Sequence, residues 1–123
     1  MLASSIGWIL IVSGTATAAG GLAACLFPQP VLRLVFGAKS TDGLTVFFTR
    51  HWGALLFVVC ALTVYSAYVP AARVPILMAA IIEKFAIVML IFFGPAKRTV
   101  VMTAIASMDG TLAVLFAAYL AGL

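Results

Sequence analysis

Long apolar stretches, interrupted by prolines, glycines and charged residues, divide the sequence into four segments. They cover approximately residues 2–27, 44–69, 76–93 and 100–123. Each has about 18 residues or more, and a helix of that length, rising about 1.5 Å per residue, crosses most of the roughly 30 Å of hydrocarbon in a bilayer. Only helices and closed barrels satisfy their backbone hydrogen bonds in lipid, and the sequence lacks the alternating strands of a barrel. The pattern therefore predicts an all-α fold, a single domain over residues 1–123 that forms a bundle of four transmembrane helices.

The composition agrees with a membrane protein and excludes three other classes. Hydrophobic residues make up 66% of the chain and charged residues only 8%, whereas soluble domains have about 25% charged residues. A chain of 123 residues buries only about two thirds of its surface on folding, so it cannot hide this much apolar area by itself. Soluble and disordered proteins are therefore excluded. Nucleic-acid binding is excluded too, because the seven Lys and Arg residues behind the net charge of +4 form no basic stripe.

Basic residues in the connections predict the orientation in the membrane. The connection after the second segment holds only Arg73, whereas those after the first and third, counted together with the start of the next segment, hold Arg33, Lys39, Arg50, Lys97 and Arg98. Since short cytoplasmic loops are enriched in Lys and Arg, we expect both termini on the outer side. The amphipathic rings of Trp and Tyr prefer the membrane interface, and four of them would then lie near the outer one: Trp8, Tyr65, Tyr68 and Tyr119.

The segment 31–36, with the sequence Val-Leu-Arg-Leu-Val-Phe, is too short to cross a membrane. We expect an ordinary connecting segment that is anchored by its apolar side chains. A short helix along the inner interface is the alternative.

Three charged residues fall in the middle of the predicted spans, namely Glu83 and Lys84 in the third and Asp109 in the fourth. A central Asp or Lys costs about 2.5–3.5 kcal/mol on insertion, whereas each Leu, Ile, Phe or Val returns about 0.3–0.6 kcal/mol. The apolar residues of the third segment are worth roughly 5 kcal/mol on this scale, which Glu83 and Lys84 together consume. We therefore expect all three charges to face protein or water and not lipid.

Arg50, near the start of the second segment, completes a set whose formal charges add to zero. The helical rise places Glu83 and Asp109 at similar depth, and the long side chain of Arg50 can extend toward them. We therefore expect Arg50, Glu83, Lys84 and Asp109 to form one neutral charge network inside the bundle. Two interpretations of this network stay open. It fixes helix pairing and register, or it binds a ligand or proton, with Glu83 and Asp109 as candidate catalytic residues.

His51 follows Arg50 directly and is a further candidate for ligand or proton binding. With Glu83 and Asp109 it offers the side-chain types of a metal site, but one His is a poor set of ligands, so we expect it at the interface, bonded to water or headgroups. Trp52 is expected to be an interfacial anchor or a packing residue. The two cysteines stand 35 positions apart without a C-x-x-C pattern. The sequence therefore predicts no metal and no cofactor.

Small residues recur every four positions in the first segment, as Ser13, Thr17, Gly21 and Cys25 and as Ala16, Gly20 and Ala24. Small side chains at this spacing let membrane helices approach closely. The two stripes indicate packing within the bundle or, as the alternative, a face for a homo-oligomer. Four residues predict similarly close packing around Asp109 in the fourth segment, namely Thr103, Ser107, Gly110 and Thr111.

The layout of the chain resembles that of the DoxX-like small four-helix membrane proteins. The similarity rests on the four spans, the short loops marked by Pro and Gly, and the motif Arg50-His51-Trp52-Gly53, an Arg-x-x-Gly that opens the second span. It implies a multi-pass protein of the bacterial inner (plasma) membrane with an accessory role, linked in some members to quinone-dependent oxidoreductases. It implies no role for an individual residue of this chain.

Together these observations favour an accessory or scaffold protein that lies among membrane lipids and binds a lipophilic small molecule or another membrane protein. A proton-coupled small transporter is the first alternative. It is expected to act as a dimer, because four helices enclose little space. A membrane isomerase with Glu83 and Asp109 as acid and base is the second, and it requires a cavity within one protomer that reaches both carboxylates. The chain has no Ser-His-Asp set, metal cluster or phosphate loop, which counts against an enzyme.

Overall fold

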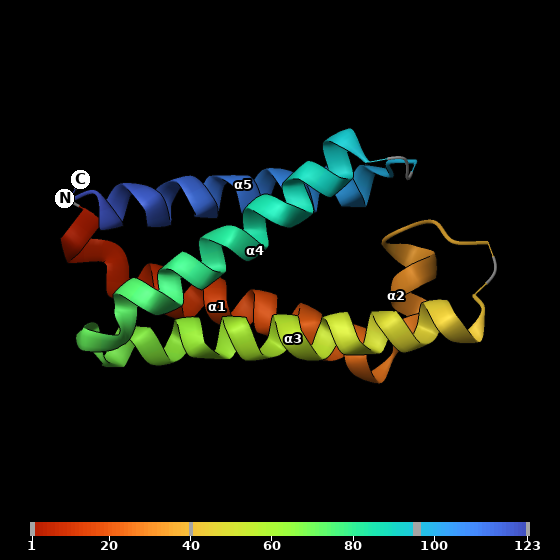
Figure 1. Ribbon diagram of the computed structural model, residues 1–123, viewed down its shortest axis with the longest axis horizontal. Coiled ribbons are helices and arrows are strands. Elements are labelled where there is room, and N and C mark those ends of the chain that lie inside the picture. Colours follow the sequence, from red (N-terminus) through yellow and green to blue (C-terminus); the bar gives the residue numbers. More distant parts are fainter. Residues whose placement is uncertain (1, 40, 95–96, 123) are drawn as a thin grey trace.

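The computed structural model of the chain describes residues 2–39, 41–94 and 97–122, and it is a bundle of helices (Figure 1). The helices are α1 (Leu2–Leu26), α2 (Pro28–Leu34), α3 (Gly43–Tyr68), α4 (Arg73–Phe93) and α5 (Val100–Leu120), with a short 3₁₀ turn η1 (Pro70–Ala72) before α4. All but α2 are long and apolar enough to cross a membrane. The predicted all-α fold with four spans is therefore confirmed, and the chain is a small multi-pass membrane protein.

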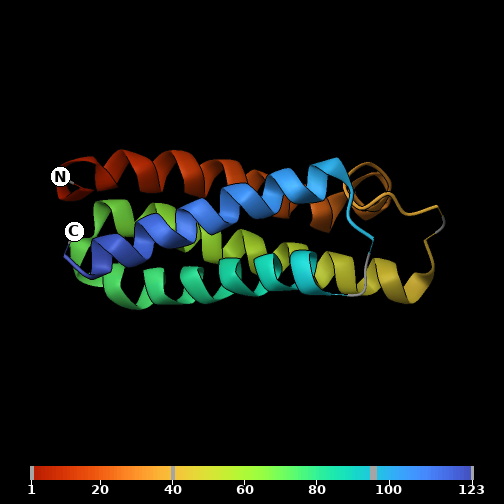
Figure 2. The same cartoon turned by 90° about the horizontal axis from the view of Figure 1, so that it is seen from above.

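The two ends of the bundle hold different elements (Figures 1 and 2). At one end, here called the termini end, α1 begins, α5 ends and η1 connects α3 to α4. At the other, here called the α2 end, lie α2 and the connection between α4 and α5. The start of α1 and the end of α5 are thus on one side of the bundle, as expected. That this side is the outer one stays a prediction.

Helices α1 and α3 pack closely because glycines stand where the two backbones meet. A Cβ atom on Gly53 would lie 2.5 Å from the carbonyl oxygen of Gly21, and one on Gly21 would lie 2.7 Å from the backbone nitrogen of Phe57. A Cβ on Gly14 would lie 2.7 Å from Cγ2 of Val64. The stripe of small residues that contains Gly21 therefore serves packing within the protomer, where close van der Waals contact stabilises membrane helices.

Two apolar cores stabilise the ends of the bundle. The core at the termini end consists of Ile6, Leu10, Leu77, Ala80 and Phe116. The core at the α2 end consists of Ile91, Met102 and Ala106, with Val35 and Phe36 packed against them. Helices α4 and α5 contribute to both cores, so the residues halfway along them, including Lys84 and Asp109, lie between the two.

The expectation of an ordinary connecting segment after α1 was wrong, because residues 28–34 form the helix α2. Pro28 and Pro30 favour this outcome, since proline fixes a helical φ and its missing N–H is not needed in the first turn of a helix. Leu32 is buried against the bundle. The helix lies across the end of the bundle (Figures 1 and 2). Just beyond it, the Thr99 hydroxyl donates a hydrogen bond of 2.6 Å to the carbonyl oxygen of Val35, which joins this segment to the start of α5.

Close packing of the polar stripe on α5 was also a wrong prediction for three of its four residues. Thr103, Ser107 and Thr111 are exposed. Each hydroxyl donates to the carbonyl oxygen four residues earlier in the same helix, so none of them needs a neighbouring helix as a partner. Gly110 is the exception, since a Cβ there would lie in ordinary contact with Val88, at 3.7 Å.

Candidate functional site

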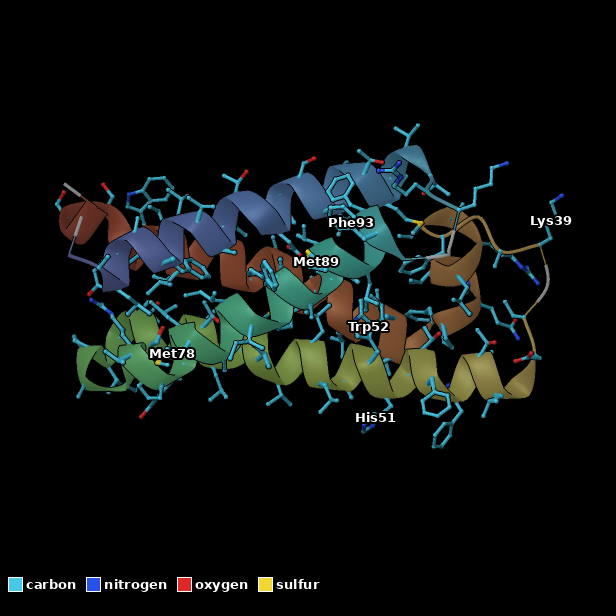
Figure 3. All side chains as sticks on the ribbon, turned by 45° about the horizontal axis from the view of Figure 1, so that its top comes forward. Lys39, His51, Trp52, Met78, Met89 and Phe93 are labelled. Carbon is cyan, nitrogen blue, oxygen red and sulfur yellow. The ribbon has the colours of Figure 1, made fainter. Side chains whose placement is uncertain are left out.

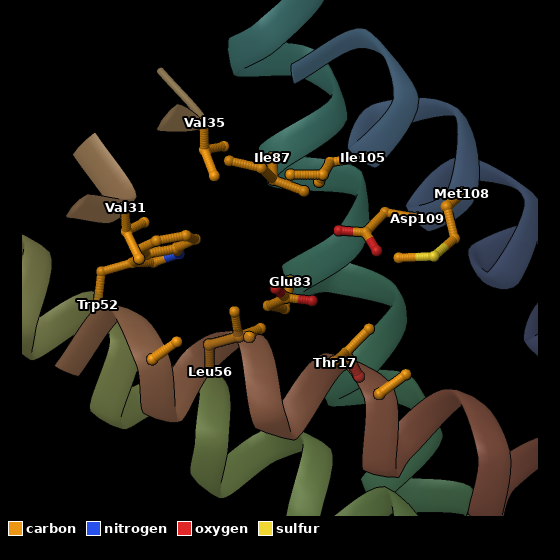
Figure 4. Close-up of a pocket in the computed structure, with 13 residues that line it drawn as sticks. Thr17, Val31, Val35, Trp52, Leu56, Glu83, Ile87, Ile105, Met108 and Asp109 are labelled. Atoms are coloured by element: carbon orange, nitrogen blue, oxygen red, sulfur yellow. The ribbon is translucent and has the colours of Figure 1, made fainter. Parts of the chain in front are cut away.

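A cavity of about 280 Å³ extends from the middle of the long helices toward α2, and Figure 4 shows the residues that line it. All five helices or their ends contribute to its wall, and apart from Thr17 and two carboxylates the wall is nonpolar except for one indole N–H. The lining residues are Ala16, Thr17, Gly20, Ala23, Val31, Val35, Trp52, Leu56, Glu83, Ile87, Ile105, Met108 and Asp109. The cavity therefore combines an apolar wall with two acidic groups.

Three charged side chains meet beside this cavity. Nζ of Lys84 lies 3.5 Å from Oδ1 of Asp109 and 3.9 Å from Oε2 of Glu83. The side chains of Lys84 and Asp109 are 4% and 8% exposed, whereas that of Glu83 is 22% exposed. Glu83 and Asp109 both line the cavity, Glu83 from α4 and Asp109 from α5 (Figure 4).

The charged atoms of this cluster are short of hydrogen bonds. Among the described residues, Oε2 of Glu83, Nζ of Lys84 and Oδ1 of Asp109 are buried and have no hydrogen-bond partner. A buried polar atom without a partner typically costs about 1–3 kcal/mol, and a charged one costs more. The two carboxylates can therefore still accept hydrogen bonds or pair with a positive charge.

The expected four-residue neutral network is corrected by the position of Arg50. Its side chain is exposed, and Nη1 donates a hydrogen bond of 3.4 Å to the carbonyl oxygen of Cys25 on α1. The neighbouring Thr49 is buried instead. One helical step turns the side-chain direction by about 100°, so a residue at a favourable depth can still point away from the interior.

His51 and Trp52 lie on opposite sides of α3. His51 is exposed and points away from the bundle, whereas Trp52 points between the helices (Figure 3). The Trp52 ring lines the cavity and packs edge-on against Phe36, with 6.0 Å between the ring centroids. His51 is thus separated from the two carboxylates, and in the part of the chain that the structure describes no group of three His, Cys, Asp or Glu residues is arranged to hold a metal ion.

The cavity opens between α1 and α5. Ala16 and Gly20 on α1 and Met108 on α5 are the exposed residues of its lining, whereas the others are buried or half-buried. A Cβ atom on Gly20 would meet nothing within 4 Å. These residues lie near the middle of their spans, so the opening faces the hydrocarbon of a bilayer. The second small-residue stripe of α1 therefore borders the cavity at Ala16 and Gly20.

Several lining residues were not predicted from the sequence. Val31 and Val35 reach the cavity only because α2 lies across the bundle, and Trp52 was expected as an interfacial anchor or a packing residue but not at a cavity. The spacing of Ala16, Gly20 and Ala23 is a signal for a helix face with room beside it, but this spacing equally fits close packing. The direction in which each face points depends on how the helices are rotated against one another.

Comparison with known proteins adds no family to this geometry: the chain matches no protein-family model, no curated protein and no solved structure. The resemblance to DoxX-like proteins therefore stays a prediction. The chemistry of the site rests on its own residues, which offer two carboxylates and one ammonium group beside an apolar cavity.

Proposed function

We propose that this protein binds a lipophilic small molecule between its helices, as an accessory protein of the bacterial inner membrane. The observation that carries the proposal is the cavity within a single protomer, apolar over most of its wall and lined by the carboxylates of Glu83 and Asp109. Ligand sites are typically apolar clefts in which a few polar groups orient the ligand. The opening between α1 and α5 supports entry from the bilayer, where such a molecule concentrates.

Trp52 provides a reporter for this proposal, because its ring lines the cavity. The chain has two tryptophans, and the other, Trp8, is exposed in the first turns of α1. A Trp8→Phe protein in phosphatidylcholine vesicles would be titrated with decylamine, 1-decanol and decanoate while Trp52 emission is recorded. A saturable change with at least one of these probes is the expected result.

Two alanines on α1 make a matched pair of variants for the same titration. Ala16 lines the cavity, whereas Ala19 does not, although both are exposed. In the Trp8→Phe protein, Ala16→Phe should abolish the saturable change because it fills the opening, and Ala19→Phe should preserve it. The absence of a response to every probe, or an unaltered response in Ala16→Phe, would refute the proposed function.

The same cavity favours one second candidate, a membrane isomerase. Acid–base catalysis needs a proton-transferring group within reach of the substrate, and Glu83 and Asp109 provide an acid and a base that line one cavity in one protomer. Lipophilic molecules that co-purify with the protein would be extracted and incubated with the purified protein in D₂O. Deuterium bound to carbon in the recovered molecule, and its absence with the Glu83→Gln protein, would support catalysis. Carbon without deuterium would support binding without catalysis.

A further inference from the structure

The charge cluster beside the cavity contains one more acidic group than basic groups. In their ordinary ionised forms Glu83 and Asp109 contribute two negative charges and Lys84 one positive charge, which leaves a net charge of −1. Arg50, which would have neutralised it, is exposed and bonded to the Cys25 carbonyl group on the side of α1 that faces α3. The departure of Arg50 from the expected network is therefore the origin of the excess.

No other charged side chain in the described part of the chain compensates this excess. Helix α1 contains no Asp, Glu, Lys, Arg or His, and the charged residue of α2, Arg33, is exposed. Helix α3 places His51 on its exposed side. Arg73, at the termini end, donates hydrogen bonds to the backbone oxygens of Ser66 and Ala67. The cavity is thus lined by two acidic groups, and Lys84 is the one basic group paired with them among the described residues.

Glu83 is the carboxylate that is available to a ligand. Its Oε2 atom lies 3.9 Å from Nζ of Lys84, compared with 3.5 Å for Oδ1 of Asp109, and its side chain is more exposed. Asp109, whose side chain is only 8% exposed, is the closer partner of the ammonium group. An uncompensated buried ion costs several kcal/mol, so a positive group on a ligand beside Glu83 would stabilise the ionised carboxylate by pairing with it.

The shape of the cavity indicates how the rest of that ligand is accommodated. Its volume of about 280 Å³ is just below that of typical ligand pockets, which range from about 300 to 1,000 Å³. A polar head with a short apolar part fills such a space. The opening between α1 and α5, bordered by Ala16, Gly20 and Met108, leaves room for a longer tail to extend into the bilayer.

We infer that the ligand is an amphiphile with one positive charge, an amine or ammonium head on an apolar tail, which enters from the bilayer between α1 and α5 and pairs its head with Glu83. This inference rests on the proposed function and narrows it to one ligand class. The head reaches the side of the cluster that Lys84 leaves unneutralised, and the tail occupies the apolar wall and the opening.

The three decyl probes test the inference, because they share a tail and differ in charge. In phosphatidylcholine vesicles at neutral pH, and at equal concentration in the membrane, decylammonium should bind at least about tenfold more tightly than 1-decanol, and decanoate should bind most weakly. Trp52 emission in the Trp8→Phe protein is the measurement. Equal affinity for decylammonium and 1-decanol would overturn the inference and leave the proposed function standing, whereas silence with all three probes would overturn both.

Glu83→Gln removes the excess charge and is the variant of choice. It should lower the affinity for decylammonium at least about tenfold and change that for 1-decanol by less than about twofold. Asp42→Asn is a matched control, because the chain has only three acidic residues and Asp42 is the exposed one, ahead of α3. It removes the same charge and should leave both affinities within about twofold. Loss of decylammonium binding in Asp42→Asn, or its retention in a folded Glu83→Gln protein, would overturn the inference.

Discussion

Replacement of Lys84 by Met tests whether its ammonium group stabilises the fold by pairing with two acidic residues in the membrane-spanning part of the bundle. The change keeps a long apolar side chain of similar reach and removes the positive charge. Glu83 and Asp109 would then face each other beside an apolar cavity, without a base among the described residues around them. We expect a large loss of stability.

The magnitude follows from the geometry of the cluster. At an effective dielectric constant of about 20, charges separated by 3.5 Å and 3.9 Å attract by about 5 and about 4 kcal/mol respectively. The cost of removing the 4%-exposed ammonium group of Lys84 from water offsets part of this attraction. Breaking a buried ion pair by removing one partner typically costs about 3–5 kcal/mol, and we expect Lys84→Met to destabilise the fold by about that amount.

The assay is unfolding by SDS in mixed micelles, followed by far-UV circular dichroism. Lys39→Met is the matched control, because Lys39 is exposed in the connection between α2 and α3 (Figure 3), and it should unfold like the wild type. The triple variant Glu83→Leu/Lys84→Met/Asp109→Leu should regain most of the lost stability, since apolar replacements of a buried ion cluster are often neutral or stabilising. A cost below about 1 kcal/mol for Lys84→Met alone would refute the reasoning.

Three further predictions concern the helices that hold the site. Gly53→Val should destabilise the bundle by about 2–3 kcal/mol in the same assay, because a Cβ at Gly53 would lie 2.5 Å from the Gly21 carbonyl oxygen. The backbone N–H of Thr45 donates a hydrogen bond to Asp42 and lowers the pKa of that carboxyl group below its usual 3.8. Asp42 should therefore protect the first amides of α3 from hydrogen exchange fully above about pH 4, and lose this effect as the pH falls further. Arg73→Gln should cost about 2 kcal/mol, because the guanidinium group donates to two backbone oxygens at the end of α3 and to a tyrosine hydroxyl of α5.

Each of these predictions has a control variant. Gly7→Ala should be neutral or stabilising, since a Cβ there meets nothing within 4 Å, and an equal loss in Gly7→Ala and Gly53→Val would contradict the packing argument. Asp42→Asn keeps an acceptor for the Thr45 N–H and should protect the amides at every pH, whereas Asp42→Ala should not. Arg98→Gln should be mild, because the Arg98 side chain is exposed and stacks over the Phe92 ring at 5.4 Å.

Much of the fold could be predicted from the positions of prolines, glycines and charges. The second span, expected over about 44–69, is the helix Gly43–Tyr68, and the first ends at Leu26 instead of residue 27. The third begins a few residues earlier than expected, at Arg73, because Pro75 is tolerated within the first turn of a helix. Helix α2 was expected only as the alternative to an ordinary connecting segment, because seven residues that begin with Pro-Gln-Pro are too short a pattern to distinguish a helix from a turn.

The candidate site could be predicted only in part. Glu83, Lys84 and Asp109 stand out because charges are costly at the centre of an apolar helix, and they meet in the structure. Arg50 was expected in the same cluster because of its charge and its depth in the second span, yet its side chain is exposed. Depth follows from counting residues along a span, whereas the direction of a side chain depends on the rotation of the whole helix.

The sequence by itself determined that four helices cross a membrane, since in hydrocarbon the backbone must satisfy its own hydrogen bonds and apolar length decides where a helix can stand. Only the tertiary structure decided which of the four charged side chains face one another, and hence that the cluster holds two acidic groups and one basic group. It also decided that Trp52, Ala16 and Gly20 border a cavity. The physical reason is that the rotation of each helix is fixed by contacts with its neighbours, such as the approach of Gly21 to Gly53, which no single span contains.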